Sequence, residues 1–242
     1  LLLPDNLEPD LTNWKAFLLR LKNPKQHIRV GLVGKYVELQ DSYKSILEAF
    51  IHAGAANEVK VEVVSIHSEH LTPENCKTSL EGLHGLLVAP GFGSRGIEGK
   101  ISAIKYVREN NIPFFGICLG MQMAVIEFAR NVIGIKDANS TEMAEQTPDP
   151  VINLMNEQKD IENKGGTMRL GTWDCTLSPG SRAHKIYKMD AISERHRHRY
   201  ELNNAYMEQL NSHGLKTTGI NPDTGLAEIV EIDSHPWFVG VQ

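Results

Sequence analysis

The chain has 242 residues, and its 25 lysines and arginines against 30 aspartates and glutamates give a formal net charge of −5. This acidic surplus argues against a general nucleic-acid binder, which would carry a basic excess. The sequence has no run of about 18 apolar residues, the length needed to cross a bilayer, and the leucines at positions 1–3 are too few for a signal-peptide core. An apolar share of 41% is ordinary for a globular protein.

The three cysteines are Cys76, Cys118 and Cys175. An odd, sparse set without a C-x-x-C pair excludes a disulfide framework and a cysteine-rich zinc site. We therefore expect a reducing, cytoplasmic compartment. A free cysteine is by default a small buried apolar residue, so a nucleophile has to be recognised from its local sequence.

Residues 1–26 form the expected connector, and residues 27–242 the expected domain. Within the connector, leucines and a tryptophan recur at helical spacing, and Pro24 ends the pattern. Asp10 or Thr12 is a candidate helix cap. We expect one amphipathic helix, which packs either on a neighbouring surface or on its own domain.

From Ile28 onward, apolar runs typical of strands alternate with helical patterns. This alternation predicts an α/β fold with a doubly wound, mostly parallel sheet flanked by helices. The expected strands cover Ile28–Val37, Val59–Ile66, Gly85–Gly93 and Ile112–Ile117, and the expected helices begin at Asp41 or Ser42 and cover Ile97–Arg108 and Leu119–Arg130. A surface excursion at Thr141–Pro150, a helix near Ala205–Ser212 and short strands follow, the strands at Leu215–Ile220, Leu226–Ile232 and Trp237–Val241.

One tract, Gly116–Gly120, joins a buried strand directly to a helix. Its sequence GICLG has the arrangement of a nucleophile elbow, with cysteine in place of serine. In such an elbow the nucleophile stands above the sheet on a strained turn, and strand and helix approach so closely that the positions two before and two after it tolerate little side chain. Gly116 and Gly120 meet that requirement. We therefore expect Cys118 to be a nucleophile and the other two cysteines to be structural.

The same turn has features that would assist catalysis. A thiol with an ordinary pKa of about 8.5 is mostly protonated at neutral pH, and we expect the positive end of the following helix to favour an exposed thiolate. The N–H of Leu119 is expected to point at an oxyanion formed on a carbonyl that Cys118 attacks. A second donor is expected from the loop Ala89–Gly96, where the Gly91 N–H is free to approach.

The tract GICLGMQ (Gly116–Gln122) resembles the G-x-C-x-G-x-Q elbow of the class I, triad-type glutamine amidotransferases. Further tracts, which together reach from one end of the chain to the other, are similar to one branch of this family: Gly34–Ala49, Gly91–Ile101, Asp137–Glu142, Gly165–Gly171, Glu194–Glu201 and His235–Gln242. On these tracts the chain is identified as a member of the family. The resemblance implies the class I glutamine amidotransferase fold for residues 27–242.

The resemblance also implies the roles of single residues. Cys118 would form a glutamyl thioester, with Gly91 and Leu119 as oxyanion donors. A zwitterionic amino acid needs an anion for its ammonium and a guanidinium for its carboxylate, and Glu142 and Arg199 supply one of each. No metal site or cofactor is implied in this domain. The residues implied to bind the substrate are Gly91, Leu119, Gln122, Glu142 and Arg199.

For the whole protein, the resemblance implies that ammonia from L-glutamine passes to a synthetase domain N-terminal to this region. That domain would use ATP and Mg²⁺ to aminate UTP to CTP, with GTP as an effector of glutamine hydrolysis. The full-length protein would be a homo-oligomer that binds neither nucleic acid nor membrane. The connector helix would join its two domains.

The sequence departs from the family pattern at two places. The family completes its triad with a His and a Glu in an F-H-P-E tract after the last strand, so we expect these partners of Cys118 to lie beyond Gln242 and this chain to hydrolyse glutamine poorly. His235 belongs to a similar H-P pair that the family has in addition, so it is not expected to be the base. In the oxyanion loop, Pro90 stands where the family usually has glycine, and proline cannot donate an N–H.

Several alternatives stay open on the residues alone. His196 and His198 in the tract Glu194–Tyr200 could share a metal, but two histidines without a third ligand are weak evidence, and anion or ligand recognition by the arginines of that tract is better supported. Gly165–Gly171 could be a phosphate loop, but without the P-loop lysine a turn leading into a strand is favoured. The chain could also serve an amidotransferase of the GMP or anthranilate type, or be a non-catalytic docking module.

Overall fold

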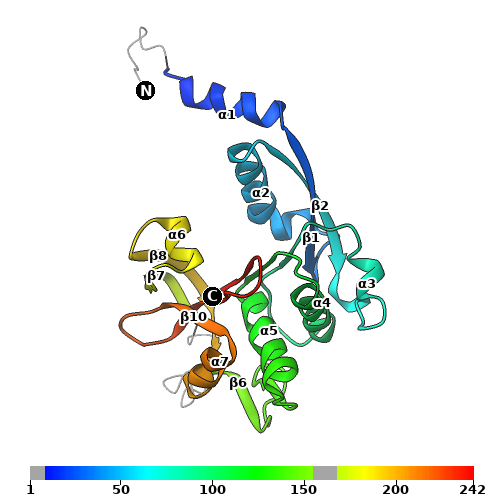
Figure 1. The fold of residues 1–242 in the computed structure, drawn as a ribbon, viewed down its shortest axis with the longest axis vertical. Helices are drawn as coiled ribbons and strands as arrows, with labels where there is room; N and C mark the ends of the chain where they lie inside the picture. The colour runs from blue at the N-terminus through cyan, green and yellow to red at the C-terminus, as the bar shows by residue number, and fades with distance from the viewer. Residues whose placement is uncertain (1–8, 155–167) are drawn as a thin grey trace.

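The computed structural model describes residues 9–154 and 168–242. Within them, nine strands form a mixed sheet in the order β2-β1-β3-β4-β12-β11-β10-β7-β8 (Figure 1). The first five strands in this order run parallel, and each later strand is antiparallel to the one before it. The α/β fold predicted from the sequence is confirmed, with an antiparallel extension beyond β12. The strands are β1 Gln26–Gly34, β2 Val59–His67, β3 Gly85–Val88, β4 Phe114–Ile117, β7 Arg169–Leu177, β8 Ala191–His198, β10 Leu215–Ile220, β11 Ala227–Ile232 and β12 Phe238–Val241.

Helices cover both faces of the parallel strands (Figure 1). Successive residues of a strand point to opposite faces. Val33 and Phe114 therefore pack in the cluster that includes α4 and α5, whereas Leu32 and Leu87 pack against α2. The helices are α1 Thr12–Lys22, α2 Lys44–Ala56, α3 Cys76–Ser79, α4 Ile97–Glu109, α5 Leu119–Phe128, α6 Arg182–Tyr187 and α7 Met207–His213. In the part of the chain that the structure describes, none of them is both long and apolar enough to span a bilayer.

A second sheet of three strands, in the order β5-β6-β9, packs beside α5. The tract Thr141–Pro150 runs from the end of β5 into the first two residues of β6 and is exposed or half-buried throughout, in keeping with the expected surface excursion. The chain passes directly from the large sheet to the small one, because β8 ends at His198 and β9 begins at Tyr200. Arg199 is the single residue between them. The strands of this sheet are β5 Ala138–Ser140, β6 Asp149–Leu154 and β9 Tyr200–Leu202.

Some predicted boundaries differ from the observed ones. The helix expected from Asp41 or Ser42 begins as a 3₁₀ turn at Gln40–Tyr43 and continues as α2, and no side chain caps it. The helix after the elbow ends at Phe128 and passes into a π-helical turn. A strand was expected after the glycine tract, and β7 begins there, but its partner β8 was not predicted, because its residues are largely polar.

The connector helix is present as α1, and it packs on its own domain along one side only. Phe17 meets His52 of α2, with ring centroids 5.2 Å apart, whereas Trp14 is exposed. At the start of the helix, Asp10 accepts a hydrogen bond from the N–H of Thr12 at 3.0 Å. Figure 1 shows α1 reaching away from the sheet, so most of its surface has no contact with the domain.

The turn between β4 and α5 has the geometry predicted for a nucleophile elbow. Cys118 has φ +52° and ψ −106°, a backbone conformation that L-residues rarely adopt. A Cβ atom on Gly120 would lie 2.2 Å from the Val88 carbonyl oxygen of β3, and one on Gly116 would lie 2.7 Å from the carbonyl carbon of Gly120. Strand, helix and neighbouring strand therefore approach so closely that only glycine fits at either position.

The helix behind this turn is held by an ion pair inside the protein. All residues of α5 are buried, including Glu127. Arg108 of α4 donates to both carboxylate oxygens of Glu127, each at 2.8 Å. Burial raises the pKa of Glu127, and the paired guanidinium opposes that shift. A bidentate partner of this kind offsets the cost of placing a carboxylate in the core.

We expect Gly120→Ala to lower the free energy of unfolding by about 3 kcal/mol, because a methyl group there would overlap backbone atoms that cannot move aside. Gly85→Ala is the matched control, because a Cβ atom there would make only ordinary contacts, the nearest at 3.5 Å. We expect it to lower the free energy of unfolding by less than about 1 kcal/mol. Urea unfolding followed by circular dichroism measures both. Equal losses in the two variants would contradict the close approach at the elbow.

Candidate active site

Cys118 lies at the end of β4, on the edge of the sheet where the parallel strands terminate. Its backbone N–H donates to the Val241 carbonyl at 2.7 Å, which ties the turn to β12. The carbonyl of Cys118 accepts the N–H of Gln122 at 3.1 Å in the first turn of α5. The backbone N–H of Leu119 and, more weakly, the side chain of Gln242 both lower the pKa of the Cys118 thiol. The sulfur is thus held between a helix N-terminus and the end of β12.

The sulfur is less exposed and less acidic than the sequence predicted. Only 8% of Cys118 is accessible. The pKa of its thiol is raised to about 11, chiefly by burial and further by the carboxylates of Glu201 and Glu142. The expectation of an exposed thiolate is therefore wrong for this structure, because desolvation outweighs the field of the helix N-terminus. The bend is present, but the thiol needs a base to ionise at neutral pH.

The loop expected to give the second oxyanion donor lies against the elbow. A Cβ atom on Gly91 would lie 3.4 Å from Cδ2 of Leu119, so the loop backbone approaches the start of α5 closely. Two residues further on, the Gly93 N–H donates to Oε1 of Glu142 at 2.7 Å. The structure thus brings Gly91, Leu119 and Glu142 together beside Cys118, and their catalytic and binding roles stay predictions.

Two buried lysines that the sequence analysis missed lie under this loop. Lys35 donates to the Phe92 carbonyl, and Lys100 of α4 is only 1% exposed. Burial and then repulsion from Lys35 lower the pKa of Lys100 to about 8, while Cys118 and Glu142 raise it. Both ammonium groups therefore contribute positive potential at the loop. A lysine on the apolar stripe of a predicted helix was the signal that could have revealed Lys100.

The remaining predicted substrate residues approach the same place from different elements. The side-chain amide of Gln122 donates to the Tyr200 carbonyl at 2.8 Å and to Oε1 of Gln242 at 3.3 Å. The pKa of Tyr200 is raised by burial and by Glu142 and lowered by Arg199, so both charged groups act on its hydroxyl. Glu142, which also acts on the Cys118 sulfur, and Arg199 therefore both influence this one ring. This pairing has the charges that a zwitterionic amino acid requires.

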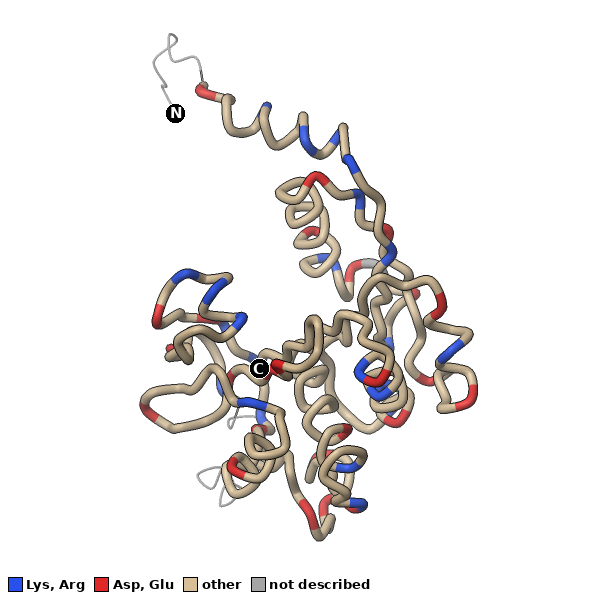
Figure 2. The backbone as a smooth tube through the Cα atoms, viewed as in Figure 1, with Lys and Arg blue, Asp and Glu red and all other residues tan. Residues whose placement is uncertain are grey.

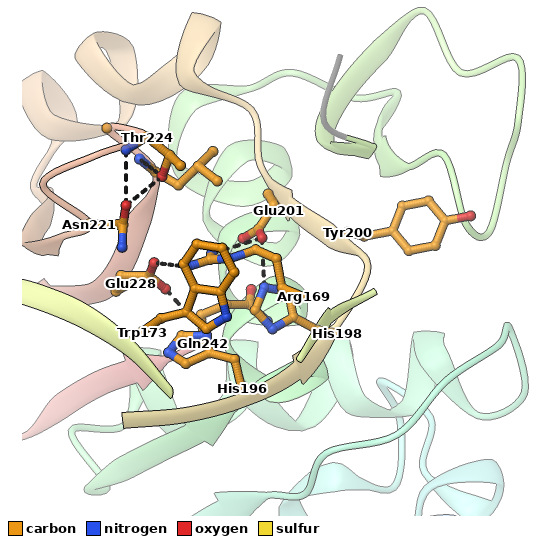
Figure 3. Close-up of polar contacts among 12 residues, drawn as sticks. Arg169, Trp173, His196, His198, Tyr200, Glu201, Asn221, Thr224, Glu228 and Gln242 are labelled. Carbon is orange, nitrogen blue, oxygen red and sulfur yellow. Dashed lines mark hydrogen bonds and ion pairs between the residues drawn. The ribbon is translucent and has the colours of Figure 1, made fainter. Parts of the chain in front are cut away.

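Next to these residues lies a buried ionic cluster of Arg169, His196, His198, Glu201 and Glu228 (Figure 3). Arg169 donates through Nη1 to Oε1 of Glu201 at 2.9 Å and through Nη2 to Oε1 of Glu228 at 2.7 Å. Nε2 of His198 lies 2.6 Å from the same oxygen of Glu201. Burial and the adjacent His198 and Arg169 lower the pKa of His196 to about 4, which leaves it neutral at physiological pH.

The two histidines considered as metal ligands belong to this cluster. Nδ1 of His196 lies 3.6 Å from Oε2 of Glu228, and His198 meets a carboxylate that Arg169 also holds. Over residues 9–154 and 168–242, no three His, Cys, Asp or Glu side chains are grouped as they would be around a metal ion. Sequence reasoning missed Arg169 and Glu228 as members. A glutamate inside the apolar run of β11 was the available signal for the second.

Two arginines of the same tract lie on the exposed face of β8, and the third follows the end of the strand. Arg195 and Arg197 are exposed, on the side opposite the buried histidines. Figure 2 shows Lys and Arg gathered where β7, β8 and α6 meet. Arg199 follows the end of β8 and is half-buried. Of the arginines in this tract, Arg199 is the one whose charge acts on Tyr200, the residue whose carbonyl holds the Gln122 amide.

His235 lies far from Cys118. It precedes β12, whereas Cys118 is tied to the other end of that strand. Nε2 of His235 lies 3.3 Å from the Val107 carbonyl, and Nδ1 accepts the N–H of Trp237 at 3.1 Å. Its ring is therefore engaged at the opposite edge of the sheet, and it cannot serve as the base for Cys118.

The glycine tract considered as a phosphate loop is only partly described. Gly165, Gly166 and Thr167 lie outside the described residues. The rest of the tract enters β7, which begins at Arg169. This agrees with the expectation that a strand follows. The side chain of Arg169 points into the ionic cluster and is 3% exposed, so it is not available to a phosphate at the surface.

Comparison with known proteins identifies the family. A model described as glutamine amidotransferase class-I matches residues 38–242. A curated CTP synthase from Flavobacterium johnsoniae is 67% identical over 240 residues, which are 99% of this chain and 45% of that protein. A CTP synthase from Christiangramia forsetii is 63% identical over 242 residues, or 44% of its length. The chain thus spans less than half the length of these relatives.

Solved structures agree with the sequence relatives. The structure titled as the glutaminase domain of Trypanosoma brucei CTPS with bound acivicin is 39% identical, with a TM-score of 0.83, and the match covers 89% of this chain and 84% of that one. A putative GMP synthase protein from Thermoplasma acidophilum, with a TM-score of 0.54 and 13% identity over 89% of this chain and 82% of its own, shares the fold alone. The chain therefore belongs to the class-I glutamine amidotransferase family, in the branch formed by the glutaminase domains of CTP synthases.

Proposed function

We propose that this domain hydrolyses L-glutamine through a thioester on Cys118 and passes the ammonia to a synthetase that converts UTP to CTP. The observation that carries the proposal is the strained turn at Cys118, with a helix N-terminus and the Gly91 loop at the same point. The identity of the substrate, L-glutamine, is inferred from the family to which the chain belongs. The ionisable groups around the turn carry the charges needed to recognise it.

The reaction begins when the Cys118 thiolate attacks the carboxamide carbon of glutamine. The carbonyl oxygen becomes an oxyanion, and the N–H groups of Leu119 and Gly91 stabilise it. As the carbon–nitrogen bond breaks, nitrogen takes up the proton that the thiol gave to a base, and ammonia leaves. Water then attacks the thioester, which releases glutamate and restores the thiol.

Recognition of the amino-acid end falls to residues around Tyr200. Glu142 would accept hydrogen bonds from the substrate ammonium, and Arg199 would bind its carboxylate. Gln122, fixed through its amide to the Tyr200 carbonyl, would complete the pocket. These three side chains come from separate elements, so the pocket exists only in the folded domain.

Activation of the thiol requires a base, since its pKa is raised to about 11. Among the described residues, no histidine is among the groups that act on the Cys118 sulfur. We assign this role to the His of the family's F-H-P-E tract, oriented by the Glu of the same tract, both beyond Gln242. The buried ammonium of Lys100 would favour the negative charge that then forms.

For the full-length protein, we propose an N-terminal synthetase domain that binds ATP, Mg²⁺ and UTP, joined to this domain through α1. GTP would act as an effector, and the assembly would be a homo-oligomer in the cytoplasm. Support comes from the length of the CTP synthases that match this chain over less than half of their sequence. Within this domain the reaction requires no metal or cofactor, because an amide is cleaved by a sulfur nucleophile and oxyanion donors.

Labelling with acivicin, a glutamine-mimicking electrophile, tests the glutaminase proposal in the full-length protein. We expect one adduct, on Cys118, and protection by L-glutamine. Cys118→Ala should abolish labelling and Cys76→Ala should leave it unchanged. Arg199→Met should raise the half-saturating concentration about 10- to 100-fold, the worth of one charge-assisted hydrogen-bond pair. Labelling that glutamine does not slow, or no labelling of Cys118 at all, would favour the docking module.

The raised thiol pKa predicts a steep pH dependence for simple alkylation of the 242-residue chain. Only the thiolate reacts, so the rate of Cys118 modification by iodoacetamide should rise about tenfold per pH unit between about pH 7 and pH 10. Glu142→Gln removes a charge that raises the pKa, and should therefore speed the reaction at pH 8, whereas the exposed Glu98→Gln should not. Site-resolved mass spectrometry gives the rates, and a plateau below pH 9 would contradict the assignment.

A further inference from the structure

The chain crosses from β8 to β9 at residues 199–200, and this short segment carries two groups of the proposed glutamine pocket. Arg199 lies between the two strands, and the carbonyl of Tyr200, the first residue of β9, holds the Gln122 amide at 2.8 Å. The position of this segment therefore sets both the predicted carboxylate-binding guanidinium and the orientation of Gln122. A one-residue crossing between two sheets has little structure of its own to fix it.

Glu201 connects the two sides of this crossing. Its backbone belongs to the small sheet, where it pairs with Asn153 of β6. Its side chain reaches partners on the large sheet: Oε1 accepts Nη1 of Arg169 at 2.9 Å and lies 2.6 Å from Nε2 of His198. Arg169 and His198 are themselves register partners in β7 and β8. The carboxylate thus bridges from β9 back to both strands that lead into the crossing (Figure 3).

The Arg169 end of this bridge is rigid. The guanidinium stacks on Trp173, 4.4 Å from the ring centroid, and its second terminal nitrogen is taken by Glu228 at 2.7 Å. The side chain of Arg169 is 2% exposed, and those of Glu201 and Glu228 are each 3% exposed. A guanidinium fixed on three sides offers a constant anchor, since it cannot follow a carboxylate that moves.

The two glutamates differ in what they connect. Glu228 lies on β11 and joins Arg169 to another strand of the same large sheet. Glu201 joins Arg169 to the small sheet, and it also acts electrostatically on the Cys118 sulfur, which Glu228 does not. The two glutamates are therefore a matched pair for an experiment, because they are equally buried and both bind Arg169. Only Glu201 is attached to the segment that contains Arg199 and Tyr200.

We propose that Glu201 is a positioning residue for the glutamine pocket, because it ties Arg199 and Tyr200 to the anchored Arg169. This inference rests on the proposed glutaminase function. In the intact bridge, Arg199 keeps the position from which it would bind the substrate carboxylate, and the Tyr200 carbonyl keeps Gln122 oriented. Without the bridge, Arg199 and Tyr200 are still present, but their position relative to Cys118 is no longer fixed.

The test compares Glu201→Gln with Glu228→Gln in the full-length protein. Each removes one carboxylate charge from Arg169, so a merely structural role predicts equal effects. We expect E201Q to raise the half-saturating concentration of acivicin about tenfold, with the limiting rate at saturation not reduced, and E228Q to stay within about twofold of wild type. Amide hydrogen exchange of residues 199–203 without ligand should accelerate in E201Q alone.

The outcomes separate this inference from the proposed function. Saturable wild-type labelling with equal effects of E201Q and E228Q would overturn the positioning role and leave the glutaminase proposal intact. Absence of saturable wild-type labelling would overturn the glutaminase proposal, and the exchange measurement would still decide whether Glu201 holds the segment. If E201Q does not fold, His198→Asn removes one of the two contacts of Glu201 while Arg169 stays paired. H198N should raise the half-saturating acivicin concentration and accelerate amide exchange of residues 199–203, as E201Q does. If neither quantity changes, the bridge is refuted.

Discussion

At the turn between β4 and α5, close packing holds the backbone of Cys118 in a conformation that L-residues rarely adopt. The order of strands explains why the rest of the site assembles there. β3 and β12 are the neighbours of β4, and all three run parallel. The loop after β3 therefore brings Gly91 to one side of the sulfur, and the end of β12 brings Gln242 to the other. One strained turn thus gathers groups that lie far apart in the sequence.

Charges of both signs surround this turn with little access to water. Glu142 and Glu201 make ionisation of the sulfur harder, and the ammonium of Lys100 makes it easier. In such surroundings the protonated thiol is the resting form. A protonated, buried thiol is a poor target for oxidants and alkylating agents. The burial that raises the pKa of the Cys118 thiol therefore also shields its sulfur from such reagents.

The sequence predicted those features of the fold that local patterns encode. Apolar periodicity gave the parallel strands and their helices, and the glycines at positions 116 and 120 gave the elbow, since the close approach there excludes a side chain. It did not predict β8, because the buried positions of that strand are filled by His196 and His198, which no search for apolar residues would select. Nor did it predict the raised pKa of Cys118 or the burial of Lys100. Both depend on segments that only the folded chain brings near: some exclude water, and others, such as that of Glu201, bring a charge to the sulfur.

The passage of the chain from one sheet to the other at Arg199 has a mechanical consequence. Arg199 lies at a seam between two sheets, whereas Cys118 lies on a turn embedded in the core of a single sheet. A shear of the three-stranded sheet along that seam would displace the guanidinium and leave the sulfur where it is. The position of the Arg199 charge can therefore change while the position of the Cys118 sulfur does not.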